Sequence, residues 1–96
     1  MRILAIDYGM ARTGIAVSDP TGLIASPYTV IPSRNYEKLL AGIGNVLKEI
    51  QPDKIIIGYP GRTDGARSEM CDRVDRFRDE LKQRFSVETE PVDEKY

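Results

Sequence analysis

The chain has 96 residues, of which 41% are hydrophobic and 30% charged, a composition typical of one small globular domain with a single core. The formal net charge of −1 excludes a general positive field for nucleic acid, so any phosphate binding must come from a local cluster. The chain has no histidine and a single cysteine, Cys71, which excludes histidine-based catalysis, histidine metal sites and internal disulfides.

The first third of the chain is expected to form three strands joined by tight turns. These strands cover residues 3–7, 13–18 and 23–31. Asp7 closes the first apolar run, and Gly9 and Gly14 are interpreted as backbone requirements of the turn that follows it. Pro27 lacks a hydrogen-bond donor, so we expect the third strand to bend there and to lie at an edge of the sheet.

The spacing of apolar residues then changes to that of an amphipathic helix. Its apolar face comprises Tyr36, Leu39, Leu40, Ile43, Val46, Leu47 and Ile50. Asn35 is a suitable N-cap, and Pro52 ends the helix. Residues 54–58 form a β-branched run without alternation, which predicts a central parallel strand buried on both faces.

The last part of the chain predicts a loop over residues 60–65, a second helix and a strand over residues 87–92. The apolar face of this helix carries Met70, Val74, Phe77 and Leu81. The order βββαβαβ predicts an α/β fold, with a five-stranded mixed sheet and flanking helices in a single domain over residues 1–96. The expected core comprises Leu4, Ile6, Leu40, Ile43, Leu47, Ile55, Ile56, Ile57, Val74, Phe77 and Leu81.

Acidic residues follow two of the strands that this topology makes parallel. Asp7 ends the first strand, where it is also suited to capping the turn, and Asp93 and Glu94 follow the last strand. The carboxyl ends of parallel strands meet at one sheet edge, where two carboxylates can share a divalent cation that activates water against a phosphate. Oxygen ligands suit Mg²⁺ or Mn²⁺. Because strand residues alternate between faces, the sequence leaves open whether Asp93 or Glu94 joins Asp7.

Positive residues expected near the same edge are candidates for binding phosphate. They are Arg12, Arg62 and Arg67. Taken singly, each of them is more typical of a solvated surface charge. The mixed charges of the second helix indicate a solvated face rather than a binding surface, and they belong to Asp72, Arg73, Asp75, Arg76, Arg78, Asp79 and Glu80.

Four segments of the chain match a known family in register. They are Asp7-Tyr8-Gly9-x-x-Arg12-x-Gly14-Ile15-Ala16-Val17-Ser18-Asp19, Pro52-Asp53-Lys54-Ile55-Ile56-Ile57-Gly58-Tyr59-Pro60, Asp64-Gly65 and Asp93-Glu94-Lys95. On these residues the chain resembles the YqgF/RuvX family of Holliday-junction resolvases, also described as pre-16S rRNA nucleases. The resemblance implies a ribonuclease-H-like fold and metal-dependent hydrolysis of phosphodiester bonds in structured nucleic acid, either a ribosomal RNA precursor or branched DNA.

The resemblance also implies roles for individual residues. Asp7, together with Asp93 or Glu94, would be a catalytic ligand of Mg²⁺ or Mn²⁺. Lys95 stands where the family commonly has arginine. It keeps the positive charge that attracts phosphate, but it lacks the guanidinium group that donates two parallel hydrogen bonds. Family members continue into C-terminal helices that supply another catalytic aspartate, whereas this chain ends at Tyr96, either as a shortened piece or as a natural short form. We therefore expect the 96-residue chain to cleave poorly or not at all.

Two other classes of protein share part of this pattern. Sugar kinases and actin-like proteins also begin with a strand, an aspartate and a glycine-containing turn, but they need a second domain for which 96 residues leave no room. A non-catalytic nucleic-acid-binding or assembly module is the other alternative, and the missing C-terminal acid favours it. Neither a signal peptide nor a membrane-spanning run is predicted, so we expect a cytoplasmic protein with no membrane partner. RNA or DNA as substrate, and the oligomeric state, stay open at this point.

Overall fold

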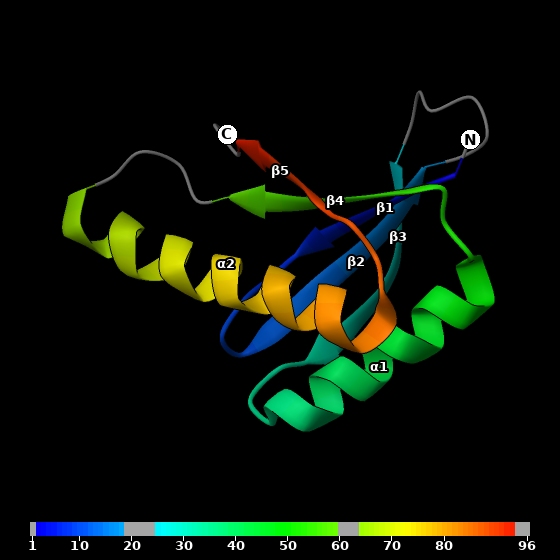
Figure 1. Ribbon diagram of the computed structural model, residues 1–96, viewed down its shortest axis with the longest axis horizontal. Helices are drawn as coiled ribbons and strands as arrows, with labels where there is room; N and C mark the ends of the chain where they lie inside the picture. Colours follow the sequence, from blue (N-terminus) through cyan, green and yellow to red (C-terminus); the bar gives the residue numbers. More distant parts are fainter. Residues whose placement is uncertain (1, 19–24, 60–63, 94–96) are drawn as a thin grey trace.

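The computed structural model describes residues 2–18, 25–59 and 64–93. The elements follow the predicted order βββαβαβ. They are β1 (Ile3–Asp7), β2 (Arg12–Ser18), β3 (Ala25–Pro32), α1 (Tyr36–Ile50), β4 (Lys54–Tyr59), α2 (Asp64–Phe85) and β5 (Glu90–Asp93). The five strands form one sheet in the order β3-β2-β1-β4-β5, and Figure 1 shows the two helices packed beneath it.

The pairing of the strands follows from the lengths of their connections. A short turn joins β1 to β2, which pair antiparallel, whereas α1 and α2 provide the long crossovers that parallel pairing of β1, β4 and β5 requires. The prediction that β3 is an edge strand is confirmed. Its register shifts where Ile15 pairs with Thr29 but Ala16 pairs with Pro27, so the irregularity lies at Tyr28, next to the proline where a bend was expected.

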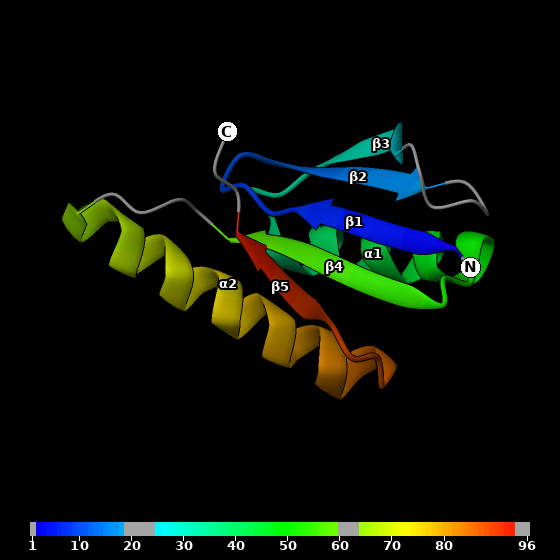
Figure 2. The same ribbon diagram turned by 90° about the horizontal axis from the view of Figure 1, so that it is seen from above.

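Both helices cover the same face of the sheet, as Figures 1 and 2 show together. The register sets Leu4 beside Ile55 and Ile6 beside Ile57 on this face, and these side chains pack against α1 and α2 in one core. The buried hydrophobic residues are Leu4, Ile6, Ile15, Leu39, Leu40, Ile43, Val46, Ile55, Ile57, Val74, Phe77 and Leu81. This core contains most of the expected residues.

The opposite face of the sheet, called the open face below, carries neither α1 nor α2. Ile56 lies on it beside Ala5 and is only half-buried, so the prediction that β4 is buried on both faces is wrong. A β-branched run suits a central strand whether one or two layers of helices cover it. Leu47 is also half-buried rather than part of the core. The buried residues that the expected core lacked are Ile15, Leu39 and Val46.

The ends of α1 are set by local contacts. Asn35 is the N-cap, as predicted, and its side-chain Oδ1 accepts a hydrogen bond from the Lys38 amide at 3.1 Å. At the other end Gln51 adopts a left-handed conformation with φ 48°, and its amide donates to the Leu47 carbonyl at 2.9 Å. The helix therefore ends just before Pro52, which cannot continue it.

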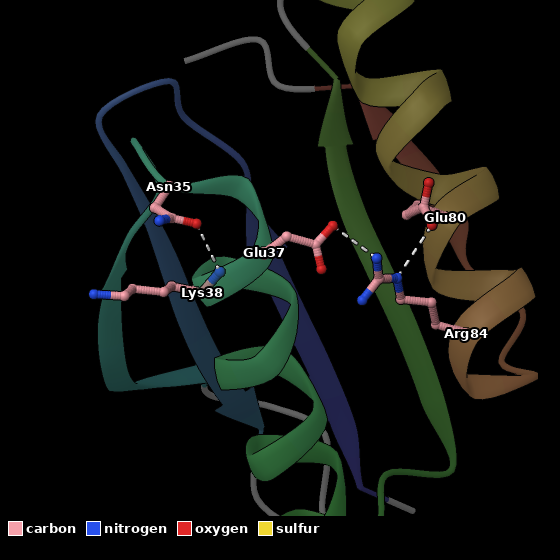
Figure 3. Close-up of polar contacts among 5 residues, drawn as sticks. All are labelled: Asn35, Glu37, Lys38, Glu80 and Arg84. Carbon is pink, nitrogen blue, oxygen red and sulfur yellow. Dashed lines mark hydrogen bonds and ion pairs between the residues drawn. The ribbon is translucent and has the colours of Figure 1, made fainter.

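A bridge of charged side chains joins the two helices (Figure 3). Arg84, near the end of α2, places Nη2 2.8 Å from Glu37 Oε2 in the first turn of α1, and its Nε 3.1 Å from Glu80 Oε2. All three side chains are partly exposed, so the bridge contributes little to stability. Neither described helix combines the length and the apolarity needed to cross a membrane.

The last strand is shorter than expected, because β5 begins at Glu90 rather than at residue 87. Arg78 of α2 holds the segment before it: Nε donates to Thr89 Oγ1 at 2.9 Å, and Nη2 donates to the Thr89 carbonyl at 3.0 Å. Val87 meanwhile packs against the core. The segment that leads into β5 is thus fixed by α2 rather than by pairing with β4.

Candidate functional site

The ends of the three parallel strands meet at one edge of the sheet, as predicted. β1 ends at Asp7, β4 at Tyr59 and β5 at Asp93, and Tyr59 pairs directly with Asp93. Arg12 begins β2 at the same edge and is exposed. In open α/β sheets, ligands gather at this edge.

Several predicted site residues lie outside the part of the chain that the structure describes. These are Arg62, Glu94 and Lys95, together with the side chains of Arg67 and Asp93. That Asp7 lies within reach of Asp93 or Glu94 therefore stays a prediction. Asp64 begins α2, and its side chain also lies outside the described part.

Asp7 is exposed, and it lines a shallow depression on the open face. Much of the floor of this depression consists of small residues, among them Ala5, Gly14, Ala16 and Gly58. Gly14 pairs with Asp7, and a Cβ at that position would lie 3.9 Å from the Asp7 Cβ, an ordinary contact. The interpretation of Gly14 as a backbone requirement is therefore wrong; its lack of a side chain leaves open space beside the carboxylate.

Gly9, in contrast, is required by the backbone of the turn after Asp7. A Cβ on Gly9 would collide with the carbonyl oxygen of Arg12. The same turn is held by a chain of hydrogen bonds around the buried Thr13, whose Oγ1 accepts from the Gly9 amide at 3.4 Å and donates to Ser33 Oγ at 3.1 Å. Ser33 Oγ in turn donates to the Gly9 carbonyl at 2.8 Å. These hydrogen bonds fix the turn that directly follows Asp7, the last residue of β1.

The donor chemistry at Asp7 fits a hard divalent cation only in part. Within residues 2–18, 25–59 and 64–93, no ion pair engages Asp7. No group of three or more acidic or cysteine residues in these ranges is arranged to hold a metal. A single exposed carboxylate can bind such an ion weakly, so tight binding needs a further oxygen ligand.

A second hollow lies on the helix side of the same edge, and the sequence did not reveal it. It is lined by Tyr8 from the β1–β2 turn, Arg34 and Tyr36 at the start of α1, and Arg73 and Arg76 of α2. We call it the arginine–tyrosine pocket. Arg73 and Arg76 were expected on a solvated face. Their spacing of three does put them on one side of α2, but only tertiary structure brings Arg34 opposite them.

Comparison with known proteins assigns the chain to a family. Residues 1–96, the whole chain, match the family described as Holliday junction resolvase RuvX. The chain belongs to the RuvX family. A relative from Chlorobium phaeobacteroides (strain BS1) is 43% identical over 94 residues, and one from Burkholderia thailandensis is 35% identical over 94 residues. Both carry the name "Putative pre-16S rRNA nuclease".

The matched relatives are longer than this chain. The alignments cover 97% and 98% of the chain but only 63% and 64% of the two relatives, so it spans less than two thirds of their length. Among solved structures, Thermus thermophilus RuvC in complex with a Holliday junction substrate superposes with a TM-score of 0.68 at 14% identity, over 97% of this chain and 63% of RuvC. This likeness confirms the ribonuclease-H-like fold, and RuvX membership decides against a sugar-kinase or actin-like assignment.

Proposed function

We propose that this chain forms the sheet and part of the acidic site of a metal-dependent nuclease that hydrolyses phosphodiester bonds in structured nucleic acid. The observation that carries this proposal is the exposed Asp7 carboxylate at the carboxyl edge of the parallel strands in a RuvX family member. The small residues around Asp7 support it, because they let a phosphate backbone approach the sheet closely.

Asp7 and one of the two acids at the C-terminal end of the chain's last strand, Asp93 or Glu94, would hold Mg²⁺ or Mn²⁺. A metal held there polarises a phosphate and lowers the pKa of a bound water. The chain itself positions the first ligand, because the Thr13–Ser33 hydrogen bonds fix the turn beside Asp7. Val92, which precedes both acids, lines the Asp7 depression, so either Asp93 or Glu94 is a candidate for the second ligand.

The substrate we propose is a ribosomal RNA precursor, in keeping with the name of the relatives. Branched DNA is the alternative, supported by the family description and by the substrate bound to the RuvC neighbour. Both are structured polyanions, so the same acidic edge can serve either. Cleavage assays with a precursor 16S rRNA fragment and with four-way junction DNA distinguish them.

Metal binding is tested with the variant Asp7→Asn and the control Asp79→Asn, which removes an equal charge from an exposed position on α2. We expect millimolar Mg²⁺ or Mn²⁺ to raise the melting temperature of the wild type and of Asp79→Asn, because ligands that bind only the native state stabilise it. Asp7→Asn should show no such rise. The second ligand is the acid, Asp93 or Glu94, whose amide variant (Asp93→Asn or Glu94→Gln) also abolishes the rise.

The outcomes separate the alternatives. If Asp7→Asn gains as much stability from the metal as the wild type, Asp7 is not a ligand. Nucleic-acid binding without metal stabilisation of the wild type favours the non-catalytic module instead. We expect cleavage by the 96 residues alone to be slow or absent, and any cleavage to disappear in Asp7→Asn. Rapid Asp7-dependent turnover would contradict the need for a further aspartate.

A further inference from the structure

The arginine–tyrosine pocket brings three positive side chains together in a chain whose net charge is −1. Among the described residues, Arg34 and Arg76 make no ion pair, and Arg73 pairs with Glu69 at 3.5 Å. Of the nearby carboxylates of α2, Glu80 pairs with Arg84 at 3.1 Å, and Asp75 makes only a 3.9 Å contact with Arg78. The pocket lining holds three arginines and no acidic residue, so it keeps an excess of positive charge even with Arg73 paired to Glu69.

Packing beneath the pocket fixes its aromatic side chains. Tyr8 stacks on the fully buried Phe77 with ring centroids 4.7 Å apart and planes inclined by 29°. Tyr36 meets the same ring edge-on at 6.5 Å. Ser33, which precedes Arg34, is tied to the β1–β2 turn by the bond to the Gly9 carbonyl. Such preorganisation reduces the entropy lost on binding a ligand.

The chemistry of these side chains fits a phosphate diester. Guanidinium groups bind phosphate oxygens through two parallel hydrogen bonds, and tyrosine hydroxyls also donate to the nucleic-acid backbone. Asp7 and Tyr8 are consecutive residues, yet Asp7 lines the open face whereas Tyr8 packs against the helix side. A strand that crosses this edge therefore meets the acid on one side and the arginines on the other.

We propose that the arginine–tyrosine pocket binds a non-reacting backbone phosphate of the nucleic acid and so positions the strand across the Asp7 edge. This proposal rests on the proposed function, because it takes nucleic acid as the ligand. Arg34, Arg73 and Arg76 are positioning residues, and their contribution requires no metal. Their effect is therefore measured on binding alone, in the presence of EDTA.

The test compares two double variants that remove the same charge. Arg34→Gln/Arg76→Gln empties the pocket of two cations, whereas Lys38→Gln/Lys48→Gln removes two exposed cations of α1. Lys38 points away from α2 in Figure 3. Binding of a precursor 16S rRNA fragment and of four-way junction DNA is measured between roughly 50 and 200 mM salt, a range over which phosphate contacts are strongly screened. Melting curves verify that all variants fold.

We expect the arginine variant to bind roughly 10- to 100-fold more weakly than the wild type, the loss typical of a charge-assisted hydrogen-bonded contact. The slope of log affinity against log salt concentration should be smaller in magnitude by about one, as expected for the loss of one phosphate contact. The lysine variant should change affinity only slightly. Arg34→Lys/Arg76→Lys should restore the salt dependence but only part of the affinity, because lysine lacks the forked geometry.

Equal losses of affinity in the arginine and lysine variants would overturn the proposal, since they would show general electrostatic attraction of the protein surface rather than a specific binding site. Failure of the wild type to bind either nucleic acid would overturn it as well. Failure of the nuclease proposal looks different: wild type and Asp7→Asn then bind in EDTA and lose affinity through the arginines, but neither responds to Mg²⁺ or Mn²⁺.

Discussion

Replacing Thr13 by valine should loosen the turn that follows Asp7. Thr13 is fully buried, and its hydroxyl both accepts from the Gly9 amide and donates to Ser33 Oγ. Valine has nearly the same shape but neither function, so the half-buried Gly9 amide and the buried Ser33 Oγ each lose a partner. A buried polar group left without a partner costs about 1–3 kcal/mol. A loss of about 2 kcal/mol lowers the melting temperature of a domain of this size by roughly 8–16 °C.

The matched control for Thr13→Val is Thr13→Ser, which keeps the hydroxyl and removes one methyl group, at a cost of about 0.8 kcal/mol. Thermal melts give the stability of each variant, and amide hydrogen exchange at Gly9 reports on the turn itself. We expect faster exchange at Gly9 in Thr13→Val but not in Thr13→Ser. If valine is tolerated as well as serine and exchange at Gly9 is unchanged, the hydrogen bonds of Thr13 do not hold this turn.

Two further predictions concern the sheet faces and the aromatic cluster. Ile57→Ala should cost about 2–5 kcal/mol in urea unfolding and Ile56→Ala clearly less, because only Ile57 is fully buried; equal costs would contradict the assignment of the faces. Burial and the nearby Glu80 raise the pKa of Tyr36 above its ordinary value of 10.0, so the native state favours the neutral hydroxyl. The stability that the neutral Tyr36 hydroxyl gives to the native state is fully present below about pH 10 and is lost as pH rises through the native pKa. Between about pH 10 and this native pKa, the free energy of unfolding of Tyr36→Phe should therefore fall less steeply than that of the wild type.

The secondary structure was predictable where local signals agree. The apolar period of α1 matches its observed span, and Asn35 caps it as expected because a cap depends only on its own turn. β5 was placed too early, since the contacts of Arg78 with Thr89 decide where pairing begins. The exposure of Ile56 was missed because a β-branched run does not reveal how many layers cover a sheet.

The edge that carries Asp7 was predictable, because parallel strands joined by helical crossovers must end on the same side. The arginine–tyrosine pocket was not, because it needs the β1–β2 turn, the start of α1 and one side of α2 at once. Local charge patterns report only a solvated helix face for Arg73 and Arg76. Positive side chains therefore reveal a shared ligand only when the packing of distant segments is known.

At the sheet edge where β1, β4 and β5 end, the short β5 strand is the least stable of the three. β5 pairs with a single neighbour, and its start is anchored by Arg78 and by a 2.8 Å contact between Lys54 Nζ and Glu90 Oε2. Elements with few buried contacts open locally at a lower free energy than the central strands. A ligand that engages the end of β5 must therefore also order it, so the measured affinity includes a local folding equilibrium. On warming, binding at this edge should weaken well before the β1–β4 core unfolds.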